Sequence, residues 1–505
     1  MQRLDGMDAS FVYLDSPTAP LQVGMTCVFD PSTAPDGYAF AKVRRLVEDR
    51  LHLIPPFRRR LVDVPAHLHR PGWIDDPDFD LDRHLHRTRL PAPGGIAELQ
   101  QFAADVISTP LDPARPPWDM HIVEGLEGGM VGSVTKMHHA AVDGISGAEL
   151  TATLLDLEPA PRPVEPPEAP WTPAPEPSPL TVAARAARDL LREPGAAASV
   201  LTRTARAALR LVRHNREPAT TPPPGPFAAP RCAYNAPLTP ARQVSMAQVD
   251  LEDVSLIKDV AEVTINDVVL ALCADALRAH LDVHAGLPEQ PLVAAVPVSV
   301  RTGDNSETSC NRLSAMLVEL GTTIDDPIER LQTIAACSRA AKTQHHVLGP
   351  ETFSQLADVT PSPLLAALGA LESRFNLLGR IPPMCNLIVS NYPGPPFPLY
   401  CAGARMVAAY PLGPLGLGTG LNITVQSYLD TLWFGVVACP DVVPEPWALA
   451  GGITDAVRKL TKAPSRPDGW RAKPSASTSP RSGEAPQTTV SSPPTPEPAA
   501  PSRPR

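Results

Sequence analysis

The sequence lacks any uninterrupted apolar run near the ~20 residues that a membrane-spanning helix requires. It also lacks a C-x-x-C pair: its eight cysteines are scattered, which disfavours a thiolate zinc site and is typical of reduced thiols. Basic residues are fewer than acidic ones, and the resulting net charge of -10 argues against a general nucleic-acid binder. The N-terminus MQRLDGMDASF carries acidic residues where a secretory signal has an apolar core. We therefore expect a cytoplasmic protein.

Proline is abundant instead, and its distribution divides the chain. The 63 prolines are unevenly spread, and the clusters at 158–180 and 217–231 exclude helix and central strand because proline fixes φ and lacks an N–H donor. Beyond residue 462 the chain is rich in proline and serine and poor in large apolar residues, which predicts disorder. A length of 505 residues suggests two or three folded units. We predict an N-terminal lobe at 1–157, a linker at 158–231, a C-terminal lobe at 232–462 and a disordered tail at 463–505.

The N-terminal lobe mixes strand and helix patterns. Residues 120–126 and 129–139 are rich in β-forming residues and are separated by a short acidic and glycine-containing turn, so they predict a hairpin. Helical spacing follows Gly144, with Ser146 and Glu149 in a capping-box relation.

The C-terminal lobe shows both patterns as well. Apolar residues recur at helical spacing over 265–284, and 291–300 has the pattern of a short buried strand. The sequence therefore predicts an α/β fold in both lobes.

The linker contains a basic segment at 181–216. Eight arginines fall at helical spacing on the two sides of Pro194 and Gly195, and with two acidic residues they give this segment a net charge of +6. Basic amphipathic helices of this kind can lie on an anionic lipid surface. The alternative is that they pack on the protein with their arginines in solvent. We favour packing, because the apolar face is mostly alanine and buries little area.

A pair of histidines followed by an aspartate and a glycine, in KMHHAAVDG, is the strongest indication of chemistry. At the end of a strand, His139 with His138 beside it can accept a proton from an alcohol, because imidazole has an unperturbed pKa of ~6.5. Asp143 either caps the following helix or fixes the turn by pairing with an arginine, and Gly144 permits a tight backbone path. Adjacent strand residues point to opposite faces, so joint chelation by both rings is disfavoured and no metal is predicted.

A histidine pair alone carries little information. His345 and His346 repeat the pair in TQHHVLGPE without the aspartate and glycine at the same offsets. The specificity therefore lies in the seven-residue pattern HHxxxDG. Ser146 does not stand in a GxSxG elbow, which disfavours a serine-hydrolase triad.

The segment HHAAVDG matches HHxxxDG, the motif of the CoA-dependent acyltransferase superfamily that includes chloramphenicol acetyltransferase-like enzymes and peptide-synthetase condensation domains. Over 1–157 and 232–460 the chain resembles the bacterial wax ester synthase/acyl-CoA:diacylglycerol acyltransferase (WS/DGAT) family. The segments that carry this resemblance are LDGMDASFVYLDSP (4–17), PPFRRRL (55–61), PPW (116–118), NDVVLA (266–271), PVSVR (297–301), SNYPGP (390–395) and LNITVQSY (421–428). Three positions depart from the family's pattern, namely Pro117 in PPW, Gln22 in LQVG and Cys310 before Asn311.

The resemblance implies a two-lobed, chloramphenicol acetyltransferase-like fold with an active-site tunnel between the lobes, CoA entering one mouth and the alcohol the other. It implies that His139 is the general base, with Asp143 in a structural role. Arg301 of PVSVR is our hypothesis for the partner of Asp143.

The resemblance also suggests supporting residues, each of which has a purely structural interpretation as well. Asn266 and Asp267 match a family segment that supports the site, yet an N-cap pair at the start of the 265–284 helix would explain them as well. Trp118 either lines the tunnel or is a core aromatic.

The implied reaction moves a long-chain acyl group from acyl-CoA to the hydroxyl of diacylglycerol and forms triacylglycerol, with no cofactor. Wax ester synthesis on a long-chain alcohol would use the same residues. A condensation domain is disfavoured because the chain shows no carrier module, and a lipid-binding or droplet-associated protein without catalysis is the remaining alternative. Expected partners are acyl-CoA and diacylglycerol or a long-chain alcohol, without nucleic acid, and with a peripheral position on the inner membrane face or on lipid droplets as an option.

Overall fold

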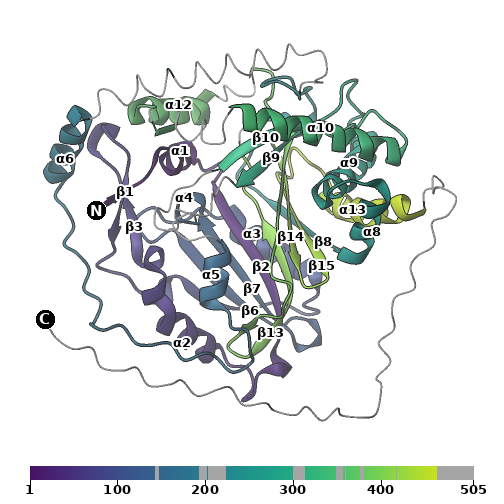
Figure 1. Ribbon diagram of the computed structural model, residues 1–505. Coiled ribbons are helices and arrows are strands. Elements are labelled where there is room, and N and C mark those ends of the chain that lie inside the picture. The colour runs from purple at the N-terminus through teal and green to yellow at the C-terminus, as the bar shows by residue number, and fades with distance from the viewer. Residues whose placement is uncertain are drawn as a thin grey trace, which may run out of the picture. The chain divides into compact units, whose positions relative to one another are not determined.

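The computed structural model describes residues 1–142, 147–192, 202, 223–299, 313–348, 357–358, 360–375, 380–416 and 418–462 (Figure 1). Strands of these residues form two six-stranded sheets and one small three-stranded sheet, with helices packed against them. The predicted α/β class is confirmed. The predicted tail at 463–505 lies outside the described residues.

The first large sheet carries the histidine motif. Its order is β12 (Tyr400–Cys401), β13 (Ala404–Leu412), β2 (Gln22–Asp30), β7 (Val131–His138), β6 (Trp118–Glu124) and β5 (Leu85–Arg89). β6 and β7 pair antiparallel, which confirms the predicted hairpin. β13 and β12 come from the C-terminal half of the chain, and β13 pairs antiparallel with β2. A segment from the predicted C-terminal lobe therefore completes the sheet of the N-terminal lobe.

The second large sheet is built from C-terminal strands. Its order is β10 (Leu313–Glu319), β9 (Val293–Ser299), β11 (Leu387–Tyr392), β14 (Leu421–Tyr428), β15 (Thr431–Ala438) and β8 (Gln243–Asp250). β9 confirms the strand predicted at 291–300. β13 contacts β14 and β15 of this sheet while it pairs with β2 of the other, so a single strand joins the two sheets. The small sheet has the order β1 (Gln2–Arg3), β4 (Gly72–Asp75) and β3 (Arg59–Val62).

Helices cover these sheets, and the predicted helix at 265–284 is present as α9 (Ile265–His284). α9 packs against α13, and its inner residues are fully buried. The helix after the histidine motif is also confirmed, as α5. None of the described helices is both long enough and apolar enough to cross a membrane. The remaining helices are α1 (Gly6–Leu14), α2 (Phe40–Arg50), α3 (Ile96–Ser108), α4 (His139–Val142), α5 (Gly147–Leu154), α6 (Pro179–Arg192), α8 (Leu251–Ala261), α10 (Pro327–Leu348), α12 (Ser362–Phe375) and α13 (Pro446–Lys462).

The first part of the proline-rich linker is bound to the N-terminal lobe. The guanidinium of Arg58 lies over the ring of Trp171, 4.8 Å from its centroid. Glu176 forms an ion pair with Arg60, with 2.7 Å between oxygen and nitrogen. Linker residues before α6 thus follow the surface of the N-terminal lobe instead of crossing solvent freely.

The start of the basic segment is helical, as predicted, and forms α6. Val182 and Ala186, on one face of α6, are buried against Val64. Arg185 and Arg188 point to solvent. The packing alternative therefore describes α6, whereas the arginines beyond residue 192 lie outside the described residues.

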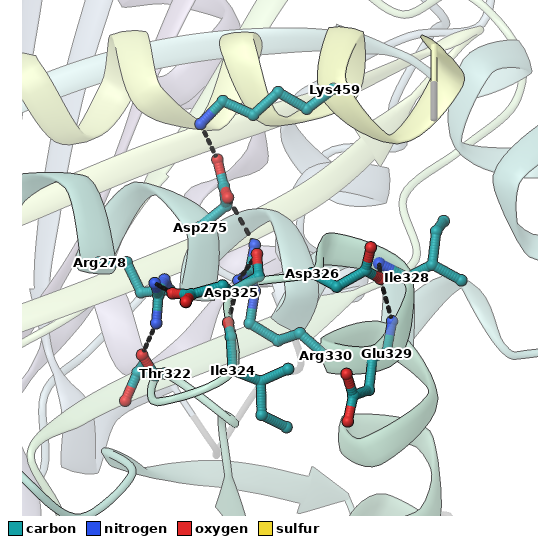
Figure 2. A network of polar contacts seen from close by, with 10 residues as sticks. All are labelled: Asp275, Arg278, Thr322, Ile324, Asp325, Asp326, Ile328, Glu329, Arg330 and Lys459. Atoms are coloured by element: carbon teal, nitrogen blue, oxygen red, sulfur yellow. Dashed lines mark hydrogen bonds and ion pairs between the residues drawn. The ribbon is translucent and has the colours of Figure 1, made fainter. Parts of the chain in front are cut away.

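A network of charged side chains ties the helices behind the second sheet together (Figure 2). Asp275 of α9 accepts from Arg330 of α10 at 2.5 Å and from Lys459 of α13 at 2.6 Å. Arg278, one turn after Asp275, donates to Asp325 in the loop before α10. Arg330 is almost completely buried, so Asp275 supplies the charge that compensates it.

Candidate active site

The predicted catalytic histidines lie where β7 ends and α4 begins. The backbone N–H of His138 donates to the carbonyl of Pro117 at 2.9 Å, and that of His139 donates to the carbonyl of Leu21 at 2.9 Å. The N–H of Ala140 donates to Nδ1 of His138 at 3.1 Å, which leaves the proton of a neutral His138 ring on Nε2. The backbone on both sides thus fixes the two histidines at the strand end.

The ring of His139 lies against α1. It stacks on the ring of Phe11, with centroids 4.1 Å apart and an angle of 21° between the planes. α1 is held in place by its N-cap, because Asp5 accepts from the N–H of Asp8 at 2.7 Å. Ala140, directly after His139, is buried with residues of the same N-terminal segment. The N-terminal segment therefore forms one wall of the site.

Burial decides the protonation state of both histidines. Loss of solvation lowers the pKa of His138 to about 4, and the neighbouring His139 ring contributes in the same direction. Loss of solvation likewise lowers the pKa of His139 to about 4, against a backbone hydrogen bond that favours the charged form. Both imidazoles are therefore neutral near pH 7, the state in which a ring nitrogen can accept a proton.

Elements from the C-terminal half border the same point. A Cβ on Gly416 would lie 3.2 Å from Cδ2 of Leu21, the residue whose carbonyl binds the N–H of His139. On the other side, α12 packs closely on α1: a Cβ on Gly369 would lie 2.0 Å from the carbonyl oxygen of Tyr13. The His139 region therefore lies where both halves of the chain meet.

Three of the predicted site residues, Asp143, Gly144 and Arg301, lie outside the described residues, as does Ser146 of the predicted capping pair; Glu149 lies in α5.

Asn266 and Asp267 are found in the first turn of α9. Asp267 accepts through Oδ2 from the N–H and the hydroxyl of Thr264, at 2.9 and 2.7 Å, and its own N–H donates to that hydroxyl. The N-cap is therefore Thr264, not the predicted Asn266–Asp267 pair. The second oxygen of Asp267, Oδ1, is buried and has no partner among the described residues. Capping thus occupies half of this carboxylate.

Trp118 is packed on all sides. Its ring stacks between Phe57 and His84, with centroids 4.1 and 4.8 Å away. Its indole N–H donates to the carbonyl of Phe57 at 2.9 Å, and the side chain is buried in the core of the N-terminal lobe. The core interpretation accounts for every one of these contacts.

Sequence reasoning missed two residues of the site, Phe11 and Gln22. Gln22 pairs with His138 across β2 and β7, so the two side chains share one face of the sheet. It is buried, and its Oε1 has no hydrogen-bond partner among the described residues. Signals existed for both: Phe11 stands in the LDGMDASF segment, and Gln22 is one of the departures from the family pattern.

A groove of about 620 Å³ opens elsewhere, between β8, α13 and α3. Trp447, Arg458 and Gln100 are among its lining residues, and neither histidine of the motif belongs to them. Among the described residues, no group of three or more histidine, cysteine, aspartate or glutamate side chains could hold a metal ion.

The two joined sheets, with the histidines of HHxxxDG at the end of a central strand, form the two-lobed fold that condensation domains also have. The first condensation domain of the calcium-dependent antibiotic synthetase, in complex with a substrate analogue, has the same fold, with a TM-score of 0.53 at 15% identity over 92% of this chain and 97% of that chain. At this identity the likeness concerns the fold alone.

Sequence comparison then identifies the family. The chain belongs to the wax ester synthase/diacylglycerol acyltransferase family: its catalytic domain matches residues 4–269, and the WS/DGAT C-terminal domain matches residues 309–461. A protein of Mycobacterium tuberculosis H37Rv, provisionally named a diacylglycerol O-acyltransferase, is 38% identical over 469 residues, covering 91% of this chain and 90% of that protein. The wax ester synthase/diacylglycerol acyltransferase from Marinobacter aquaeolei VT8 superposes with a TM-score of 0.64 at 26% identity, covering 91% and 98% of the two chains. The predicted resemblance is confirmed.

Proposed function

We propose that this protein transfers a long-chain acyl group from acyl-CoA to the hydroxyl of diacylglycerol and so forms triacylglycerol. The observation that carries the proposal is His139, a neutral imidazole of the HHxxxDG motif held between α1 and elements of both halves of the chain. Family membership and the activity named for the mycobacterial relative support the same reaction.

In the proposed reaction, His139 is the general base. Its unprotonated ring nitrogen takes the proton of the acceptor hydroxyl while that oxygen attacks the thioester carbonyl of acyl-CoA. The tetrahedral intermediate collapses, the C–S bond breaks, and the CoA thiolate leaves and receives the proton from the imidazolium. Negative charge that develops on the substrate raises the proton affinity of the ring during attack, which offsets the weak basicity of a desolvated imidazole.

The remaining predicted residues would support the reaction. Asp143, paired with Arg301, and Gly144 would fix the backbone turn that follows the base. Asn266 would act beside the reacting groups, and Asp267 would do so through Oδ1, the oxygen that does not cap α9. A tunnel between the lobes suits the substrate, since each buried CH₂ contributes ~0.8 kcal/mol and a long acyl chain gains much in a dry channel.

A long-chain alcohol is the second candidate acceptor. The Marinobacter relative is named for both activities, and the same base would serve both hydroxyl groups. A lipid-binding protein without catalysis is the third option, which the intact motif disfavours.

An acceptor screen distinguishes these options. Purified protein is incubated with labelled palmitoyl-CoA and either diolein or hexadecanol, and the labelled ester is identified by chromatography. We expect labelled triacylglycerol with diolein, and ~10²–10⁴-fold less with His139→Ala because that variant has no positioned base. The matched control is His346→Ala, an exposed histidine of the second HH pair, which should retain full activity. Equal turnover by wild type and His139→Ala would remove His139 from the reaction.

A further inference from the structure

The outer face of α12 exposes a row of large apolar side chains. Leu364, Leu368, Leu371 and Phe375 recur at helical spacing, and they are 51%, 46%, 43% and 45% exposed. Such a stripe normally faces the core, since burying it is favourable. The opposite face of α12 is already used, because Gly369 brings it into close contact with α1. The exposed row is therefore a second apolar face, and we call it the α12 stripe.

Neighbouring elements extend the α12 stripe. Leu14 ends α1 and Leu68 directly follows the short 3-10 helix Pro65–His67, and both are exposed large apolar residues. The same 3-10 helix contacts α12 on one side and α6 on the other, and Leu180 of α6 is also exposed. Figure 1 shows α12 and α6 on the same side of the molecule, with α1 beneath α12. Exposed apolar side chains gathered on elements that contact one another indicate an interaction site.

The charges around the stripe indicate its partner. Arg374 on α12 and Arg185 and Arg188 on α6 are exposed, and Asp358 beside α1 is paired with Arg70. Acidic residues stand in the same region, namely Glu372 on α12 and Asp63 before the 3-10 helix, and Asp63 is paired with His67. Apolar side chains bordered by arginines are the pattern of helices that lie in the headgroup region of an anionic lipid surface.

We infer that the α12 stripe docks this protein on an anionic lipid surface. The inference rests on the proposed function, because diacylglycerol and triacylglycerol reside in lipid and the acceptor must be taken from there. α1 connects the two locations: Phe11 stacks on His139, and Leu14 at the end of the same helix is exposed beside α12. Docking through α12 thus places the lipid beside the two packed helices that cover the base.

The experiment compares two double variants that carry the same added charge. L368E/L371E changes the stripe, and V260E/V283E changes two exposed valines on α8 and α9. Each protein is floated with phosphatidylcholine vesicles, with and without phosphatidylglycerol, all containing diolein. We expect L368E/L371E to lose about tenfold or more of its vesicle binding while V260E/V283E binds like wild type. Wild-type binding should increase with phosphatidylglycerol and weaken with salt.

Esterification of a water-soluble alcohol separates docking from catalysis. L368E/L371E should esterify 1-hexanol as wild type does and fail on vesicle-borne diolein. A protein inactive on every acceptor that still floats through the stripe would refute the proposed function and leave docking intact. Equal flotation of the two double variants would overturn the docking surface. If wild type is a dimer that L368E/L371E dissociates, the stripe binds a second copy of the chain and not lipid. If vesicle binding is seen only after deletion of 193–216, the stripe binds that segment and not lipid.

Discussion

The ring of Phe11 lies almost parallel to the imidazole of His139, with 4.1 Å between their centroids. This stack joins the first helix of the chain to the residue that we propose as the general base. It fixes the plane of the imidazole and covers one of its faces with an apolar surface. The orientation and the low proton affinity of His139 therefore share one cause.

Replacing Phe11 tests that relationship. In Phe11→Ala, water reaches His139, so its pKa should rise from about 4 toward the ordinary value, and kcat should fall because the ring loses its fixed plane. Phe11→Leu keeps an apolar cover without the flat contact, so it should lower kcat with a smaller change in the pH profile. The measurement is kcat/KM against pH. Profiles that coincide for wild type and both variants would show that the stack has no influence on the base.

The pH dependence of the wild type follows from three histidines that lose solvation in the fold. Burial lowers the pKa of His121, His138 and His139 to about 4 each, below the ordinary 6.5. Between these values the unfolded chain takes up protons that the folded chain does not, so the free energy of unfolding should decrease as pH falls from 6.5 to about 4. Activity should persist below pH 6.5 while the fold survives, which near-UV circular dichroism monitors. An acid limb of kcat/KM centred at 6.5 would contradict a buried base.

Gln22 offers a site where stability and function oppose each other. Gln22→Leu removes a buried oxygen that has no partner among the described residues, so we expect the free energy of unfolding in urea to increase by about 1 kcal/mol. The KM for one substrate should rise, because Gln22 shares a sheet face with His138 and its oxygen can accept from a bound donor. Thr26→Val is the matched control: it removes another buried oxygen of β2 to which the described part of the chain offers no partner, farther from the motif, and should leave KM unchanged. Destabilisation by Gln22→Leu would show that the amide is satisfied in the folded protein.

The charged network behind the second sheet allows the energetic contributions of a buried and an exposed carboxylate to be compared. Asp275→Ala leaves the buried guanidinium of Arg330 without its carboxylate, which should cost about 3–5 kcal/mol of unfolding free energy. Asp325→Ala removes an exposed carboxylate of the same network and should cost about 0–1 kcal/mol. Urea denaturation of both variants measures the difference. Equal costs would mean that Arg330 finds other compensation.

Local patterns predicted much of the fold. The helix at 265–284 is present with the same bounds because its apolar residues repeat at helical spacing behind a threonine cap. The hairpin of β6 and β7 was readable because its strands are adjacent in sequence. The position of His138 and His139 at the end of β7 followed from that hairpin.

Such local patterns do not predict which strands pair when they are far apart in the sequence. Nothing in the local sequence of 404–412 indicates that it pairs with β2, some 380 residues earlier in the chain, because a strand pattern does not name its partner. The stack of Phe11 on His139 and the pairing of Gln22 with His138 depend on the same kind of contact. The attachment of Trp171 to Arg58 was also hidden, since a proline-rich composition predicts the absence of helix and not a binding surface.

The pairing of β13, from the C-terminal half, with β2 of the N-terminal half has a consequence for biosynthesis. Until residue 412 has left the ribosome, β2 remains an open edge with unpaired backbone groups beside β7, the strand that ends at His138. We therefore expect the amino-terminal half to need the carboxy-terminal half to complete its sheet. A protein cleaved in its linker should behave as two complementing fragments that regain structure together and aggregate apart.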